Sequence, residues 1–309
     1  MPAVFSPTLY QEGRRLDLQV WKSYSPNLSV PSRITATINR VISMAMSVVL
    51  DVTFQTHQGP PVHCVLKLYD RRFGSCLRDV CKDKAAPYTQ ENEAAFEAFV
   101  KGGMMPAFLR YRKQRNETET FPVRAREFLD EPDGTGGLAK YEAALWQDYI
   151  EQFKCEIQAY HRLTDLQGTL VPLIYAHVSL SATKLATIIP QEVTPYFETW
   201  HHIIQLAVDV AYEINKRGII MEDCTPCNVV VDKKSQTLRI VDLAQCLFQD
   251  EMVSYWCQLG WDEDEDWDSD AEFWEEVRTI GNPRKTGVKM DFRYPDWNGI
   301  IVEIRQRKE

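Results

Sequence analysis

Hydrophobic and polar positions alternate clearly in the first third of the chain. Segment 62–69 would form a strand with two distinct faces, because successive side chains of a strand point to opposite sides. One face holds Val62, Cys64, Leu66 and Leu68. The other holds His63, Val65, Lys67 and Tyr69. Segment 33–55 is rich in Ile, Val and Thr and is followed by a turn, THQGPPV, so three consecutive antiparallel strands are predicted.

Three helices are predicted further along, two of them from apolar residues at helical spacing. The strongest pattern, YEAALWQDYIEQFKCEIQAYHRL at 141–163, places Glu156 on or beside the apolar face. An unpaired buried carboxylate is costly, so Glu156 is expected to have a partner. Shorter helices are expected at Glu91–Val100 and at His201–Lys216, the second of them capped by Gly218.

The remaining segments have weaker patterns. Strands are expected at 173–178 and 185–189, and the segment 219–246 is predicted to alternate short strands with loops. The charged segment 112–137 is poor in core residues and closed by glycines, so it is predicted to be a mobile surface loop. Residues 1–30 contain several prolines and are interpreted as an extended lead-in.

Composition excludes several classes of protein. The chain has 309 residues, of which 44% are hydrophobic and 26% charged, which is typical of a globular protein. Its net charge of -9 argues against a general nucleic-acid binder. The apolar stretch Ile42–Leu50 is shorter than the roughly 20 residues of a membrane helix, and the N-terminus lacks a signal-peptide layout. We therefore expect an intracellular protein, cytoplasmic or nuclear, with no nucleic-acid or membrane partner.

Five polar residues, far apart in the chain, supply the groups that phosphoryl transfer requires. That reaction needs a cation at the phosphates, oxygen ligands for Mg²⁺ and a carboxylate that accepts the proton of the nucleophile. Asp223 and Asn228 lie five positions apart in one loop, and Asp242 ends the second strand of the next hairpin. Lys67 offers the cation, and Glu156 is positioned to hold it. Together these residues predict a site for ATP and Mg²⁺.

Two other motifs receive structural interpretations. Cys224 and Cys227 form a C-x-x-C pair, but a thioredoxin-type pair opens a helix after a strand, whereas this one precedes a strand. No second C-x-x-C occurs in the sequence. The two thiols are therefore predicted to pack within a loop, and the acidic run Asp262–Asp270 is predicted to be a solvated loop.

The order of these motifs resembles that of eukaryotic protein kinases. VLK at 65–67 resembles the VAIK strand, MEDCTPCN at 221–228 resembles the HRD-x-x-x-x-N catalytic loop, and DLA at 242–244 resembles DFG. Glu156 matches the glutamate of the helix that follows the lysine strand. The chain also resembles a group of fungal kinase-like proteins, through KLYDRRFGSCLRD at 67–79, EIQAYHRLTDLQGTLVPLIYAHV at 156–178, the segment 219–246 and GNPRKTG at 281–287.

This resemblance implies a role for each residue of the motifs. Asp223 would be the catalytic base, while Asn228 and Asp242 would hold Mg²⁺. Lys67, held by Glu156, would contact the α- and β-phosphates of ATP.

The resemblance also implies a fold and an adenine site. An α+β, two-lobed kinase-like fold would have a small antiparallel-sheet N-lobe with one long helix over 31–195, including an insertion at about 70–140. A mainly helical C-lobe and tail would follow over 196–309. Val65 would cover the adenine, and the hinge near 189–194 would provide Glu192 as a further nucleotide contact.

Several positions depart from the kinase pattern and leave alternatives open. The turn SMAMS at 43–47 has no glycine, Met221 and Glu222 replace the His and Arg of HRD, and Ala244 replaces the glycine of DFG. The leading hypothesis is an ATP- and Mg²⁺-dependent phosphotransferase acting on Ser or Thr hydroxyls. The alternatives are a pseudokinase, which would bind nucleotide or protein without turnover, and a small-molecule kinase of the aminoglycoside or choline type.

Overall fold

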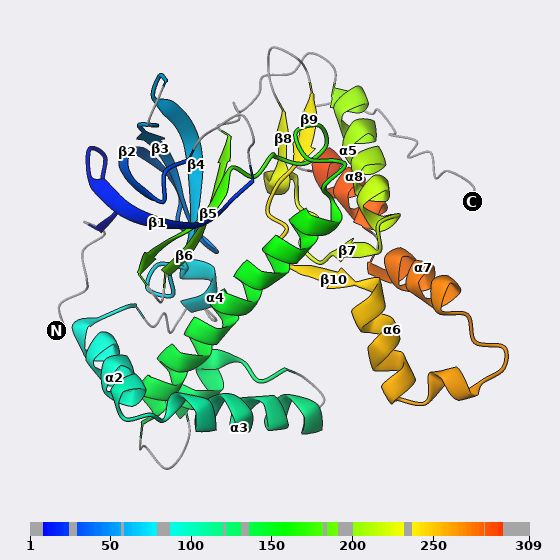
Figure 1. The fold of residues 1–309 in the computed structure, drawn as a ribbon. Helices are drawn as coiled ribbons and strands as arrows, with labels where there is room; N and C mark the ends of the chain where they lie inside the picture. Colours follow the sequence, from blue (N-terminus) through cyan, green and yellow to red (C-terminus); the bar gives the residue numbers. More distant parts are fainter. Residues whose placement is uncertain are drawn as a thin grey trace. The chain divides into compact units, whose positions relative to one another are not determined.

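The chain divides into two compact units, each of which is described by itself. A computed structural model describes residues 9–24, 30–56, 59–78, 87–119, 122–130, 136–181, 184–190, 200–231, 237–280 and 282–292. Unit 1 comprises Met1–Phe153 and Tyr175–Ile189, and unit 2 comprises Lys154–Ile174 and Pro190–Glu309. Helix α4 (Gly137–Arg162) begins in unit 1 and ends in unit 2 (Figure 1).

Unit 1 contains a closed antiparallel barrel with the strand order β1-β2-β3-β4-β6-β5. Its strands are β1 (Arg15–Ser23), β2 (Arg33–Ser43), β3 (Val48–Phe54), β4 (Val62–Tyr69), β5 (Ala176–Ser181) and β6 (Lys184–Pro190). The three consecutive strands predicted at 33–69 are confirmed as β2, β3 and β4, with Lys67 paired in register with Val49. The barrel interior is a hydrophobic core that includes Leu50, Leu66 and Leu68.

The closed barrel corrects two expectations from the sequence. A small antiparallel sheet was expected, but β1 pairs with β2 from Arg15↔Thr37 onward and with β5 from Gln19↔Ser179 onward, so it closes the sheet. Residues 15–23 are therefore a structural strand rather than only a lead-in. Closure gives the backbone groups of both sheet edges hydrogen-bonding partners, which an open sheet would leave exposed.

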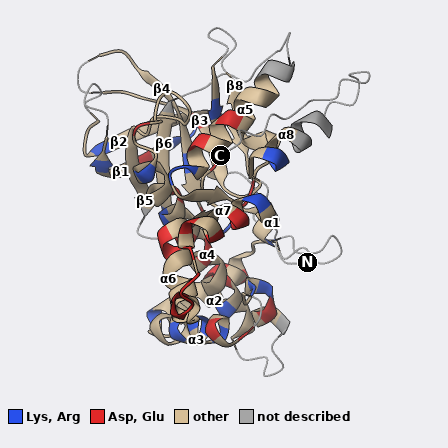
Figure 2. Ribbon diagram, turned by 90° about the vertical axis from the view of Figure 1, so that its right-hand side faces the viewer, with Lys and Arg blue, Asp and Glu red and all other residues tan. Residues whose placement is uncertain are grey.

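The helical part of unit 1 corrects the expectation of a mobile loop at 112–137. It consists of α1 (Ser75–Arg78), α2 (Gln90–Lys101), α3 (Met105–Thr118), η2 (Ala125–Asp130) and the first part of α4. Phe128 is fully buried in an apolar cluster with Phe96 and Phe108. Arg112 is also buried, and its guanidinium donates to the carbonyl oxygens of Ala144 and Val123, each at 3.1 Å. The surface of α2 and α3 carries charges of both signs (Figure 2). The helix expected at Glu91–Val100 is confirmed as α2.

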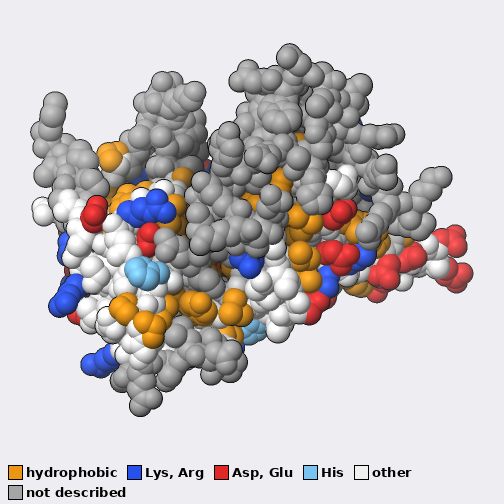
Figure 3. All heavy atoms as spheres, turned by 90° about the horizontal axis from the view of Figure 1, so that it is seen from above, with side chains coloured by type: hydrophobic (Ala, Val, Ile, Leu, Met, Phe, Trp, Pro, Cys, Tyr) orange, Lys and Arg blue, Asp and Glu red, His pale blue; other side chains and the backbone are white. Residues whose placement is uncertain are grey.

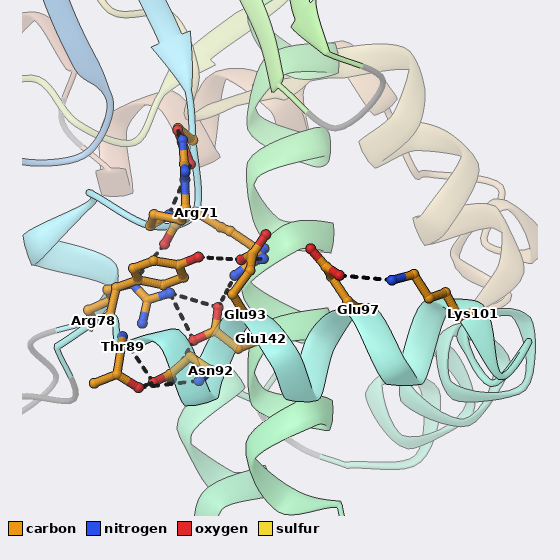
Figure 4. A network of polar contacts seen from close by, with 11 residues as sticks. Arg71, Arg78, Thr89, Asn92, Glu93, Glu97, Lys101 and Glu142 are labelled. Atoms are coloured by element: carbon orange, nitrogen blue, oxygen red, sulfur yellow. Dashed lines mark hydrogen bonds and ion pairs between the residues drawn. The ribbon is translucent and has the colours of Figure 1, made fainter. Parts of the chain in front are cut away.

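A buried ionic network joins α4 to α2 and to the segment after β4 (Figure 4). Glu142 on α4 is fully buried and accepts hydrogen bonds from Arg78 at 2.7 Å and from Asn92 at 2.7 Å. Arg71 forms an ion pair with the same carboxylate. Asn92 also completes a capping box with Thr89 at the start of α2. The network therefore fixes the beginning of α2 against α4.

Unit 2 is mainly helical and contains two short ladders. Its elements are α5 (Trp200–Asn215), β7 (Ile219–Met221), η3 (Pro226–Asn228), β8 (Val229–Val231), β9 (Leu238–Ile240), β10 (Cys246–Phe248), α6 (Gln249–Gln258), η4 (Trp261–Glu263), α7 (Ser269–Ile280) and α8 (Asn282–Phe292). The predicted apolar face of α5 is confirmed, since Ile203, Ala207, Val210 and Ile214 are all buried. Gly218 follows α5 with φ 68°, which favours glycine.

The acidic run of unit 2 is exposed, as the sequence predicts. Twelve of the 44 carboxylates of the chain lie between Gln249 and Val277, a segment without lysine or arginine. Asp262 to Asp266 are exposed, and no described lysine or arginine forms an ion pair with them. Figure 3 shows acidic side chains gathered on one part of the surface. Across the described residues, every helix is too short or too polar to cross a membrane.

Candidate functional site

Two loops of unit 2 connect the same two β-ladders. Backbone hydrogen bonds join the two loops at each end. The loop 222–228 leads from β7 to β8, and the loop 241–245 leads from β9 to β10. β7 pairs with β10, and β8 pairs with β9. Beside the first ladder, the N–H of Glu222 donates to the carbonyl of Gln245 at 3.0 Å. Beside the second, the N–H of Val241 donates to the carbonyl of Asn228 at 2.8 Å.

The first loop holds Asp223 and Asn228 in contact. The Asn228 amide nitrogen donates to the Asp223 carbonyl at 3.0 Å and to its carboxylate at 3.2 Å. Pro226 opens the η3 turn, which brings the Asn228 N–H to the carbonyl of Thr225 at 2.9 Å. Asn228 is buried and Asp223 half-buried, so one carboxylate is oriented by an amide while it keeps access to solvent.

The second loop places Asp242 in an unusual backbone conformation. Asp242 has φ 63°, and it is the sole non-glycine residue with positive φ among the described residues. Aspartate adopts this left-handed region more readily than most residues, but strain of this kind is concentrated at functional sites. Because Val241 is bonded to Asn228, Asp242 follows directly after the tie between the two loops.

A buried pair of asparagines supports the start of the first loop. Asn282 Oδ1 accepts the N–H of Met221 at 2.6 Å, and its amide nitrogen donates to the Met221 carbonyl at 2.7 Å. Asn215 donates to Asn282 at 3.1 Å and to the carbonyl of Ile219 at 2.8 Å. Sequence reasoning missed this support, although GNPRKTG at 281–287 had been singled out by resemblance. A single asparagine in the sequence carries no local signal of a partner that lies about 60 residues away.

Lys67 and Val65 lie in unit 1, on the outer face of β4. Their neighbours Cys64, Leu66 and Leu68 belong to the barrel core, so Lys67 and Val65 point out of the barrel. Lys67 is only 7% exposed, and its Nζ lies 5.3 Å from the ring centroid of Tyr69. The environment of the lysine is therefore largely desolvated.

The turn between β2 and β3 has no glycine and is hydrogen-bonded to α4. The Tyr149 hydroxyl donates to the Met46 carbonyl at 2.9 Å. Gly74 packs against the same two groups, and a Cβ at this position would overlap the Tyr149 hydroxyl. The turn between β2 and β3 is thus held by a side chain within unit 1.

Glu156 lies in unit 2, in the last turns of α4. It is 2% exposed. Its neighbour Cys155 binds the second loop through Leu243 and the start of β10 through Cys246. The structure thus brings this helix segment to the loop that carries Asp242. Glu192 and most of the expected hinge at 189–194 lie outside the described residues.

The two loops offer oxygen ligands that suit Mg²⁺. The Asn228 amide nitrogen donates to two oxygens of Asp223, and no hydrogen bond of Asn228 Oδ1 to a described residue is found. The oxygen donors of the two loops are the carboxylates of Asp223 and Asp242 and the amide oxygen of Asn228. Mg²⁺ is commonly held by one or two carboxylates together with substrate phosphates. Over the described ranges, no group of three or more His, Cys, Asp or Glu side chains is arranged to hold a metal. The oxygen donors of Asp223, Asn228 and Asp242 are of the type that Mg²⁺ prefers.

The cysteine interpretation is confirmed in part. Cys224 is buried and its thiol donates to the Met221 carbonyl at 3.0 Å, but Cys227 is exposed. Both are free thiols. Only one of the two is therefore packed within the loop.

Comparisons with solved structures find kinase domains that are weakly similar to this chain. No family model matches the chain, and no curated protein matches its sequence. A rhoptry kinase from Toxoplasma gondii is 10% identical, with a TM-score of 0.37 over 80% of this chain and 55% of that chain. The Mycobacterium tuberculosis PknI kinase domain is 12% identical, with a TM-score of 0.31 over 68% of this chain and 60% of that chain.

A third similar structure is the ROP18 kinase domain in complex with AMP-PNP and sucrose. It is 8% identical, with a TM-score of 0.40 over 80% of this chain and 60% of that chain. The chain thus spans between 55% and 60% of the lengths of these three structures. Because the identities and TM-scores are low, the function below depends on the residues of this chain.

Proposed function

We propose that the chain binds ATP with Mg²⁺ and transfers a phosphoryl group to a hydroxyl, as a phosphotransferase of the protein-kinase-like type. One observation carries this proposal. The loops 222–228 and 241–245 are tied at both ends, so Asp223, Asn228 and Asp242 belong to one small assembly in unit 2. A hydroxyl of Ser or Thr in a protein is the substrate class that the proposal favours.

The residues of unit 2 have separate roles in this proposal. Asp223 accepts the proton of the attacking hydroxyl, and the Asn228 amide keeps its carboxylate oriented. Asn228 Oδ1 and the Asp242 carboxylate hold Mg²⁺. When bound, the metal neutralises charge on the phosphates. Positioning and electrostatic stabilisation account for nearly all of the catalysis in reactions of this kind.

The proposal further requires residues of unit 1 and of α4. Lys67 contacts the α- and β-phosphates, and Glu156 pairs with its ammonium group. Both side chains are nearly buried, at 7% and 2% exposure, and a buried charge requires such a partner. Val65, on the same strand face as Lys67, covers the adenine, and Glu192 contacts the nucleotide at the hinge.

A pseudokinase is the second candidate, and the turn between β2 and β3 favours it. Glycines in the corresponding kinase loop let backbone N–H groups approach the phosphates. Here Met46 is bonded to Tyr149 instead, which restricts the turn. Such a protein would bind nucleotide without efficient transfer.

Nucleotide binding by wild type and Asp242→Asn tests the proposal. A ligand that binds only the folded state raises the melting temperature, so ATP with Mg²⁺ should stabilise the wild type. Asparagine also tolerates positive φ, so this variant removes the charge without disturbing the backbone. We expect affinity to fall at least about tenfold, because one charge-assisted metal contact is lost. Asp264→Asn, which changes an exposed acid, is the matched control and should bind as the wild type does.

The outcomes separate the two candidates. Phosphate transfer from labelled ATP should be measured with peptide and small-alcohol panels, which also distinguish protein from small-molecule substrates. Binding without transfer to either panel would favour the pseudokinase. If Mg²⁺ and ATP give the wild type no stabilisation, the proposed site is wrong.

A further inference from the structure

Two cysteines meet in unit 2 where α4 contacts the second loop and the start of β10. Cys155 on α4 donates its thiol to the carbonyls of Cys246 at 3.5 Å and Leu243 at 3.7 Å. Its sulfur in turn accepts the N–H of Cys246 at 3.2 Å. Both are free cysteines.

The thiols of Cys155 and Cys246 differ in solvent exposure and in pKa. Cys155 is half-buried, whereas Cys246 is 8% exposed, so an oxidant from solvent meets Cys155 first. The hydrogen bond from Cys246 lowers the pKa of the Cys155 thiol, against the opposing effect of burial. The same contact, together with burial, raises the pKa of the Cys246 thiol. Because the thiolate is the reactive form, Cys155 is the nucleophile of the pair and Cys246 its resolving partner.

We propose that Cys155 and Cys246 form a peroxide-sensitive thiol pair that closes to a disulfide. The Cys155 thiolate attacks one oxygen of hydrogen peroxide, the O–O bond breaks, and a sulfenic acid forms. The released hydroxide and the proton from Cys155 make one water. The Cys246 sulfur then attacks the Cys155 sulfur, the S–O bond breaks, and the S–S bond forms with loss of a second water. Two thiols are oxidised by two electrons, and the peroxide is reduced to two waters.

The new bond would act on the candidate site. Glu156 follows Cys155 on α4, and Asp242 lies in the loop that Cys155 contacts through Leu243. Bond formation withdraws the Cys155 sulfur from the carbonyl of Leu243 and from the N–H of Cys246, so the segment with Asp242 must adjust. This consequence rests on the proposed function, and it predicts that the oxidised protein binds nucleotide several-fold more weakly. The disulfide itself does not depend on that function.

Disulfide mapping of the full chain is the test. Wild-type protein is treated with hydrogen peroxide, blocked at its remaining thiols, digested and analysed by mass spectrometry. We expect one major cross-link between Cys155 and Cys246, with the loss of two free thiols per chain. It should disappear in Cys155→Ser and in Cys246→Ser, and persist in Cys257→Ser, which alters another partly exposed free cysteine of unit 2.

Two further readouts sharpen the result. The cross-link joins residues 91 positions apart, so oxidised wild type should melt roughly 5 to 10 °C higher than reduced wild type, and a reductant should reverse the shift. A major cross-link of Cys224 with Cys246 or Cys227, or simple overoxidation without any cross-link, would overturn the proposal. If the cross-link forms but reduced protein binds no nucleotide, the proposed function fails and the thiol pair stands.

Discussion

Two carboxylates of the molecule differ in how fully their charge is compensated by neighbouring groups. In unit 1, the Glu142 carboxylate is fully buried and is bonded to Arg71, Arg78 and Asn92. In unit 2, the Asp223 carboxylate is half-buried, and an amide, Asn228, donates to it. The first carboxylate uses its charge to hold helices together. The second is kept in position and within reach of solvent.

The difference shows how a structural acid is distinguished from a chemical one. A buried carboxylate stabilises a fold only when its neighbours compensate its charge, as the two guanidinium groups do at Glu142. A catalytic carboxylate must exchange a proton with a substrate, so it needs access and a partner that orients without neutralising. Glu142 has the compensated environment of a structural carboxylate, and Asp223 has the accessible environment that a catalytic carboxylate needs.

The largest expected effect is on stability, from Glu142→Ala. Removal of this carboxylate would leave Arg71 and Arg78 buried without their shared anion. We expect the free energy of unfolding to fall by roughly 3–5 kcal/mol, measured by urea denaturation. The matched control is Glu97→Ala, which breaks an exposed pair with Lys101 and should cost at most about 0.5 kcal/mol. Equal losses for the two variants would contradict the structural role of the network.

Asp148 offers an intermediate effect, which depends on pH. It pairs with Arg112 at 2.6 Å, but burial outweighs this partner and raises the pKa of Asp148 to about 6. The folded state therefore binds the proton more tightly than the unfolded state does. The resulting stabilisation is complete below the unfolded pKa of about 3.9 and is lost as the pH rises through about 6.

The comparison with Asp148→Asn isolates this contribution. Between pH 4 and pH 7 the unfolding free energy of the wild type should fall relative to that of the variant, by up to about 3 kcal/mol. Urea denaturation of both proteins across this range measures the difference. A difference that is constant with pH would show that the fold does not disfavour the ionised carboxylate.

The smallest expected change in stability comes from Asp223→Asn. The side chain is half-buried, and asparagine retains an oxygen that can accept from Asn228, so stability should change by at most about 0.5 kcal/mol. Phosphate transfer should nevertheless fall by roughly 10²–10⁴, because the proton acceptor is removed. Loss of stability as large as that of Glu142→Ala would place Asp223 among the structural acids.

Much of the local structure could be predicted from the sequence. Alternation at 62–69 predicted β4, and helical spacing predicted α5 and the apolar face of α4. A helix was also expected where α2 lies. The resemblance also singled out Asp223, Asn228 and Asp242, which the structure brings into two connected loops. Their roles, and those of Lys67, Val65, Glu156 and Glu192, stay predictions.

Nonlocal contacts were beyond the reach of the sequence. β1 closes the barrel by pairing with β5, more than 150 residues away, and no local pattern at 15–23 indicates that partner. The segment 112–137 has few apolar residues, yet Phe128 is buried because distant helices cover it. Similarly, nothing near Asn282 indicates that it binds Met221.

The sequence by itself determined which residues share a face of each strand or helix, because side-chain periodicity is a local property of the backbone. Only the tertiary structure decided that the loops 222–228 and 241–245 are tied at both ends, and that α4 reaches the second loop through Cys155. Such contacts depend on hydrogen bonds between residues far apart in the chain. Their partners are selected only when the whole core packs.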